Sequence, residues 1–331
     1  IDLVIKKLLN ACNLILINNN NSHEFFPLIG DISPDCEPDW LYSLMNSNLL
    51  GLSGNTANSQ NYAWSNLFKD YKMNHLIDFK SRVFEFNELG SFDGSEWRRI
   101  DFESWTAIFH AESPNGKPLA SHGHHDYGSI VLFLDGKEIL IDAGRCDYTS
   151  SEIGSYGINA NAHNSILLNG FVPVLKRGDR LLPEEYREIS ASVIFEKFNK
   201  GLKVSFEHDG FSRISRNKII HKREYIFSRD TCHITDEVNG KGDYFYECFF
   251  HFPDLIGISK IDEDIEKNFN KLKVKMTEKD NQLERDSYCS SNNPIRGVRF
   301  LSYGEVTPAL TQRFFGKVKL PFKQTHKLSR H

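Results

Sequence analysis

The stretch Ser129-Ile-Val-Leu-Phe-Leu-Asp-Gly-Lys-Glu-Ile-Leu-Ile-Asp142 decides the fold class. Two apolar runs flank Asp135-Gly136-Lys137, and Asp-Gly between two such runs is a strong hairpin signal. Long helices do not alternate with the strands predicted after residue 80, which disfavours a parallel sheet. The pattern therefore predicts an antiparallel β-sandwich over residues 81–331. Further strands of this kind are predicted at Phe102–His110, Ser165–Leu168, Leu202–Glu207, Asn217–Phe227, Cys232–Val238, Phe245–Phe252, Leu272–Met276 and Val298–Tyr303.

The first 80 residues have a different pattern and are predicted to form an α-helical segment. Apolar side chains recur at roughly helical spacing through Ile1–Ile17, up to the polar run Asn18–Ser22. Two more helices are predicted over Trp40–Leu50 and Asn61–Lys72. The chain is thus expected to hold two parts, a helical one over 1–80 and a mainly β one over 81–331.

Composition excludes several classes of protein. The 331 residues are 40% hydrophobic and 25% charged, as in an ordinary globular protein. The net charge of −4 argues against a globally basic nucleic-acid binder, so we expect no nucleic-acid partner. Runs of about eighteen apolar residues are missing, so no membrane span is expected. The six cysteines form no C-x-x-C pair, which argues against a thiolate zinc site.

Two basic runs stand out against the negative total. Residues 311–331 carry six Lys or Arg and no acid, and residues 213–223 carry five. Such runs are usually solvated faces, and they can also attract an anionic polymer.

The segment Ser121-His-Gly-His-His-Asp126 concentrates three imidazoles and a carboxylate. In an extended chain alternate side chains share a face, so His122, His124 and Asp126 would point one way and His125 the other. Imidazole is a common zinc ligand. A satisfied surface loop is the alternative. A cupin site is disfavoured, because Gly128 and Ser129 stand where that barrel needs glutamate.

Two downstream residues could complete a metal site. Asp142 ends an apolar run, and His163 lies in Asn161-Ala-His-Asn164 just before the next predicted strand. Two imidazoles and one carboxylate form a common zinc set. The alternative for Asp142 is that it caps a turn.

The order of these motifs resembles the heparinase II/III-like family of polysaccharide lyases. The likeness covers roughly residues 80–305, and Phe26–Asp31 is similar to the end of the helical toroid that precedes the family's sandwich. The motifs that carry it are His122-Gly-His124-His-Asp126, Asp135-Gly136, Ile141-Asp142-Ala-Gly144 with Tyr148, Ala162-His163-Asn164-Ser-Ile166, Asn169-Gly170, Arg223-Glu-Tyr225, Asp236-Glu-Val238 and Phe250-His251-Phe252.

The resemblance implies an (α/α) toroid followed by a multi-layered antiparallel β-sandwich. It implies a structural Zn²⁺ held by His124, Asp142 and His163, and it places His122 in the catalytic cleft. The sequence departs from the family at His125, where a small residue is more usual, and at Ala143, where proline is common.

Length is the larger departure. In such lyases a catalytic tyrosine comes from the toroid, well before the first histidine motif, but only 121 residues precede His122 here. The chain begins with Ile1 rather than Met and shows no signal peptide. We therefore expect a fragment in which residues 1–80 are the remnant of the toroid and the catalytic tyrosine is missing.

The activity that the resemblance implies is β-elimination at a uronic acid in an acidic polysaccharide. His122 is the expected base or carboxylate partner. The polymer, whether glycosaminoglycan, alginate or bacterial surface polysaccharide, stays open, as does a homodimer. A periplasmic or secreted location is favoured, with a cytoplasmic one as the alternative. The alternatives are a non-catalytic zinc-bearing sandwich that binds glycans or a partner, and a zinc hydrolase.

Further residues near these motifs are candidates for substrate contact. Arg145 and Tyr148 follow the Asp142 turn and could line the cleft, with packing or solvent exposure as the alternative. Tyr156 and Asn159 are similar candidates. Asn164 could reach substrate or bond a strand end.

Overall fold

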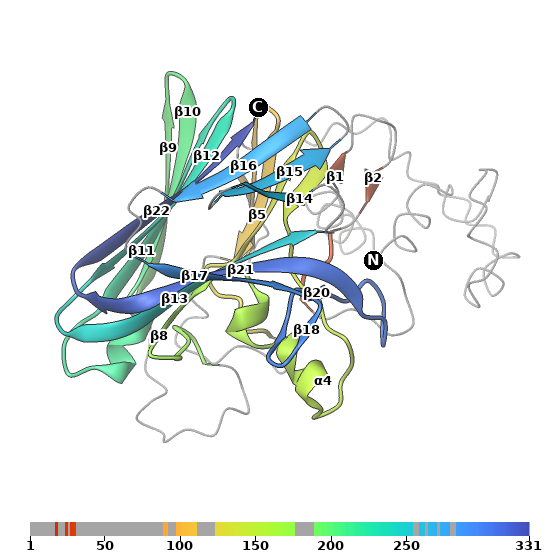
Figure 1. The fold of residues 1–331 in the computed structure, drawn as a ribbon. Helices are drawn as coiled ribbons and strands as arrows, with labels where there is room; N and C mark the ends of the chain where they lie inside the picture. Colours follow the sequence, from red (N-terminus) through yellow and green to blue (C-terminus); the bar gives the residue numbers. More distant parts are fainter. Residues whose placement is uncertain are drawn as a thin grey trace, which may run out of the picture.

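The computed structural model describes the sandwich part of the chain most fully. The described residues are 17–18, 24–25, 27–30, 89–91, 97–110, 123–175, 189–253, 258–261, 264–269, 272–278 and 283–330. Their strands pair in antiparallel fashion throughout, as the sequence predicts (Figure 1).

The largest sheet has eight strands, and its order is not the order of the chain. Strand β22 lies between β12 and β16, so a late segment of the chain joins two earlier ones (Figure 1). In order across the sheet the strands are β14 (Ile258–Ile261), β15 (Asp264–Phe269), β16 (Leu272–Glu278), β22 (Phe322–Arg330), β12 (Thr231–Asn239), β11 (Ile220–Ser228), β10 (Gly201–His208) and β9 (Ala191–Phe198).

Two five-stranded sheets complete the sandwich. The first contains β17 (Glu284–Cys289), β21 (Thr307–Lys319), β13 (Asp243–Pro253) and β8 (Ile166–Leu168), with β20 (Val298–Arg299) paired to β21. The second contains β3 (Leu89–Ser91), β4 (Trp97–Phe102), β5 (Trp105–His110), β6 (Ile130–Leu134) and β7 (Lys137–Leu140). The shorter elements are β1 (Ile17–Asn18), β2 (Glu24–Phe25), β18 (Ser291–Asn292), β19 (Ile295–Arg296), helix α4 (Glu152–Tyr156) and the 3-10 turns η3 (Ala160–Ala162) and η5 (Gly210–Ile214).

The predicted hairpin is confirmed. Strands β6 and β7 are joined at Asp135 and Gly136, which both have positive φ, 50° and 70°. A tight turn of this kind needs positive φ at both central residues, and glycine adopts it without steric cost. The single strand predicted over Phe102–His110 is wrong at its start, because the chain turns at Glu103, with φ of 53°, and separates β4 from β5.

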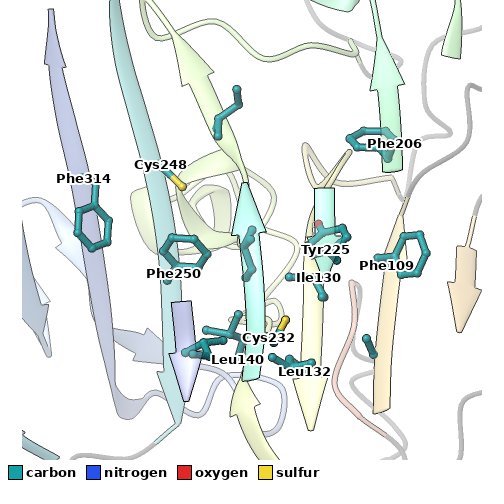
Figure 2. Packing of buried hydrophobic residues seen from close by; sticks show 14 of the residues in the cluster. Phe109, Ile130, Leu132, Leu140, Phe206, Tyr225, Cys232, Cys248, Phe250 and Phe314 are labelled. Carbon is teal, nitrogen blue, oxygen red and sulfur yellow. The ribbon is translucent and has the colours of Figure 1, made fainter. Parts of the chain in front are cut away.

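The main core lies between the large sheet and the two smaller ones. Phe206, Tyr225 and Cys232 of the large sheet pack in one cluster with Phe109 and Leu132 of the β3–β7 sheet (Figure 2). Phe250 and Phe314 of the β13–β21 pair extend this cluster, with ring centroids 6.1 Å apart. Burial of such large apolar side chains is the dominant favourable term in folding.

Strand β6 is buried on both faces, so the sandwich has more than two layers here. Ile130, Leu132 and Leu134 point into the main core, whereas Val131 and Phe133 belong to a second cluster. That second cluster includes Ile17 of β1 and the partly buried Ile29.

The predicted first helix, Ile1–Ile17, is wrong at its last residue, because Ile17 lies in a strand. Instead of closing a helix, it pairs with Phe25 in the short β1–β2 ladder and packs against Ile108 of β5. A β-branched residue fits such a position well. Residues 1–16, the other two predicted helices and the 80/81 boundary lie outside the described residues.

The basic run at 311–331 is a pair of strands with alternating burial. Lys317, Lys319 and Lys323 are exposed, while Val318 and Gln324 between or beside them are buried. The solvated-face interpretation thus describes one side of β21 and β22, whose other side is core. The strand predicted over Val298–Tyr303 ends early, at Arg299. Within the described segments, no helix is both long and apolar enough to span a bilayer.

Candidate functional site

The described part of the histidine motif, residues 123–126, is a loop fastened to the end of β5. Asp126 contacts Nδ1 of His110 at 2.9 Å, and the amide of Gly128 donates to the His110 carbonyl at 2.7 Å. Burial alone would raise the pKa of Asp126, but His110 lowers it to about 2. Asp126 therefore holds the loop as a buried carboxylate.

His124, Asp142 and His163 are brought together behind this loop. The Asp142 carboxylate contacts Nδ1 of His163 at 2.7 Å and accepts a hydrogen bond from the Gly144 amide at 2.8 Å. The rings of His124 and His163 lie 5.3 Å apart between centroids, and all three side chains are buried. Burial lowers the pKa of His163, but Asp142 outweighs this, so the net shift is upward.

The donor types of this cluster suit zinc. With Nδ1 of His163 held by Asp142, its Nε2 is buried and makes no hydrogen bond to any described residue. Among the described residues, however, no three His, Cys, Asp or Glu side chains are grouped closely enough to hold one ion.

Asn164 connects three strands rather than facing solvent. Its side-chain amide donates to the carbonyls of Ile130 and Ile141 at 2.7 and 2.8 Å and accepts from the His251 amide at 2.7 Å. The residue is 0% exposed. Of the two roles left open by the sequence, these contacts match the one at a strand end, and they leave no exposed atom for a substrate.

A buried ion pair connects the large sheet to the loops of the site. Arg223 forms a two-pronged pair with Asp236, at 2.7 and 2.8 Å. Its Nη1 also donates to the carbonyls of Gly128 and Asn164 at 3.0 and 2.7 Å. Burial would raise the pKa of Asp236, but Arg223 and His221 hold it well below its usual value. The Arg223 and Asp236 motifs thus fix the two histidine-bearing loops from behind.

Arg145 and Tyr148 lie at the surface after the Asp142 turn. The Arg145 guanidinium stands 4.2 Å from the centroid of the Tyr148 ring, and Tyr148 is 43% exposed. Tyr303, 40% exposed, lies 6.0 Å from Tyr148 between ring centroids. These three residues form one exposed patch, which we call the Tyr148 patch.

Tyr156 and Asn159 differ in accessibility. Tyr156, at the end of α4, is buried against Phe300, and burial raises its pKa to about 12. Its ring has no exposed face for a sugar. Asn159 precedes η3, is exposed and lines a pocket.

His122 lies outside the described residues, and so do the tyrosines of the helical segment. Sequence reasoning missed His110 and Tyr303, which complete the loop anchor and the Tyr148 patch. Neither carries a local motif, because each meets its partner only through the fold.

Comparison with solved structures shows which class of proteins shares this fold. Heparan sulfate lyase HepC from Pedobacter heparinus superposes with a TM-score of 0.60 at 13% identity, over 92% of this chain and 44% of that one. A heparinase III structure gives 0.60 at 14% identity, over 93% and 43%, and another gives 0.55 at 13%, over 74% and 36%. The fold is that of these lyases, and the chain spans less than half the length of their structures.

A family model described as "Heparinase II/III-like, C-terminal" matches residues 87–318. The chain therefore belongs to the heparinase II/III-like family of polysaccharide lyases, as its motifs predict. No curated protein sequence matches it.

Proposed function

We propose that the full-length protein cleaves a uronic-acid-containing polysaccharide by β-elimination. The observation that carries this proposal is the family match over residues 87–318, with the histidine loops fixed from behind by a buried ion pair. The solved structures of similar fold include heparan sulfate lyases, which agrees with an acidic substrate.

The reaction removes the proton at C5 of the uronate and expels the sugar linked at C4, leaving a C4–C5 double bond. The C5 proton is weakly acidic, so the site must stabilise the neighbouring carboxylate and hold a base close to the proton. His122 is the proposed base or carboxylate partner, because a neutral imidazole has a suitable pKa. A tyrosine of the helical toroid is the proposed acid toward the leaving oxygen.

His124, Asp142 and His163 are the proposed ligands of a structural Zn²⁺. When bound, the ion would supply only a fixed cross-link between the two histidine-bearing loops. The chain's own contacts point the same way: Asp142 orients His163, and Asp126 holds the loop to His110. Together these residues would keep His122 in position without touching the substrate.

The Tyr148 patch is the proposed contact surface for the polymer within this domain. An exposed aromatic ring offers an apolar face for a sugar, and a guanidinium recognises a carboxylate or sulfate group. Arg145 and Tyr148 bring both to one place, directly after the turn that holds Asp142.

The lyase proposal is tested by turnover. The full-length protein, incubated with heparan sulfate, alginate or another uronate polymer, should give the ultraviolet absorbance of an unsaturated product. His122→Ala should abolish that signal with little change in thermal stability. If the folded full-length protein produces no unsaturated product from any uronate polymer, the proposal is wrong. The same assay on the 331-residue chain shows whether it is active by itself.

The zinc proposal is tested by elemental analysis of gently purified protein, which should contain about one zinc per chain. Asp142→Ala should lose the metal and lower the melting temperature. Asp147→Ala, in the same turn, is the matched control, because Asp147 bonds the exposed Thr149. Wild-type protein without zinc, or an Asp142→Ala variant that retains it, would rule this site out.

A further inference from the structure

A pocket of about 370 Å³ lies beside the histidine motif. His125 lines it, whereas the neighbouring His124 contacts His163 in the cluster. The volume falls in the range of about 300–1,000 Å³ typical of small-ligand sites.

One wall of the pocket is an exposed aromatic ring on a rigid turn. Phe171 is 47% exposed and follows Asn169 and Gly170, whose φ values of 51° and 75° form a tight turn after β8. Asn169 fastens this turn to β13, since its amide and side-chain oxygen each bond the Phe245 backbone at 2.7 Å. The ring is thus presented from a fixed position, which lowers the entropic cost of binding.

The second wall carries positive charge. Arg213, in η5, donates a hydrogen bond to the Val172 carbonyl, and its guanidinium lies 5.6 Å from the centroid of the Phe171 ring. Of the basic run at 213–223, Arg213 is the residue that lines the pocket. The floor is apolar and comes from Leu167 and Val172.

The polar atoms of the pocket favour a hydroxylated anion. Among the described residues that line it, an arginine and a histidine are present and no aspartate or glutamate is. The Oδ1 atom of Asn161 is buried and bonds no described residue, so it can accept a hydrogen bond from a ligand hydroxyl. A buried polar atom without a hydrogen-bond partner lowers the stability of the protein, and a ligand that bonds this atom removes that penalty.

We propose that this pocket binds one acidic sugar unit of the polysaccharide. The sugar ring would lie on Phe171, its carboxylate would face Arg213 and His125, and a hydroxyl would donate to Asn161. This inference rests on the proposed function for the class of polymer, and it adds a second contact, separate from the Tyr148 patch.

The test measures binding without turnover. The probe is a size-defined heparan sulfate tetrasaccharide, titrated calorimetrically into the His122→Ala protein, with maltotetraose as the neutral comparison. Phe171→Ala should weaken tetrasaccharide binding about tenfold, and Arg213→Gln by a similar factor. Asn161→Asp, which places a carboxylate in the pocket, should weaken it further. The matched controls, Phe198→Ala and Arg216→Gln, replace an exposed aromatic and an exposed arginine outside the pocket and should bind normally.

Each outcome decides the inference. Unchanged binding by Phe171→Ala overturns it, because that side chain is exposed and its removal leaves the fold intact. Equal binding of maltotetraose by the starting protein overturns the acidic specificity. The lyase proposal fails separately: a protein that makes no unsaturated product can still lose tetrasaccharide binding through Phe171→Ala. If the protein is an active lyase but the pocket variants bind the tetrasaccharide normally, only the pocket inference is wrong.

Discussion

Two buried polar clusters meet at Asn164. On one side Arg223, Asp236 and His221 bond each other, and every buried polar side-chain atom of these three residues has a partner. On the other side Asp142 holds one nitrogen of His163, while the second nitrogen bonds no described residue. A complete network holds a structure together, whereas an incomplete one leaves a donor atom for a ligand. By this difference, the Arg223 cluster supports the structure of the site, and the His163 cluster is the one that can bind a ligand.

The largest effect is expected from breaking the complete network. Asp236→Asn removes the charge that neutralises the buried Arg223, and it should lower the free energy of unfolding by about 3–5 kcal/mol. Denaturant titration measures this. The next residue provides the control, because Glu237 pairs with Lys323 at the surface and Glu237→Gln should cost less than about 1 kcal/mol. Similar values for both variants would mean that the buried pair does not stabilise the fold.

Metal removal should act on the other cluster. At free zinc about 100-fold above its dissociation constant, binding stabilises the folded state by about 2.7 kcal/mol. A chelator should therefore lower the melting temperature of the wild type and leave that of Asp142→Ala unchanged. Asp236→Asn, although less stable, should retain its response to the chelator. Loss of that response in Asp236→Asn would show that the two clusters are not independent.

Acid sensitivity should arise beside the complete network. His326 is fully buried between Phe250 and Phe314, and burial lowers its pKa to about 3. Below about pH 6.5, its usual pKa, His326 is protonated in the unfolded chain but stays neutral in the folded chain. The free energy of unfolding therefore falls as the pH drops. At pH 5 this one group should cost about 2 kcal/mol.

His326→Phe keeps a ring in the core and removes the titration. Unfolding curves at pH 7 and pH 5 should therefore differ less for the variant than for the wild type. The buried His208, His221 and His251, whose pKa values burial also lowers, remain in both proteins and contribute to the residual slope. An unchanged slope in the variant would mean that His326 is not responsible.

The smallest effect is expected at the surface. Tyr148→Ala should raise KM for the polymer a few-fold, equivalent to about 1 kcal/mol, with no change in melting temperature. Tyr303→Ala should act in the same direction, since the two rings are neighbours. Steady-state kinetics of the full-length protein measures both, and a fall in kcat with constant KM would contradict a role in binding.

Much of the fold was predictable from local patterns. The Asp135-Gly136 turn and the apolar runs beside it specify a hairpin by themselves, and the strands of the core are confirmed along β10 to β13. Strands β21 and β22 were missed because their buried positions include polar residues. Gln324 and His326 occupy core positions there, and Lys323 and Lys327, which flank this segment, obscure the alternation.

The residues near the candidate site were predictable from the sequence, but the directions in which their side chains point were not. His124 and Asp142 each lie against His163, while their role as zinc ligands stays a prediction. Proximity to His163 in sequence could not show that Asn164 and Tyr156 face inward while Tyr148 faces solvent. Those directions depend on which strand each residue meets, as His110 and Asp126 also illustrate.

The position of β22 has a consequence for how the protein acquires its structure. Strands β14, β15 and β16 join the large sheet only through β22, while β9 to β12 can pair as a local meander. Contacts between distant segments form slowly, because the intervening chain must first be ordered. On a ribosome, the meander can therefore assemble early, but the core between the sheets stays incomplete until β22 inserts. Until then β12 presents an unpaired edge, and this is the stage at which the nascent domain most needs protection from aggregation.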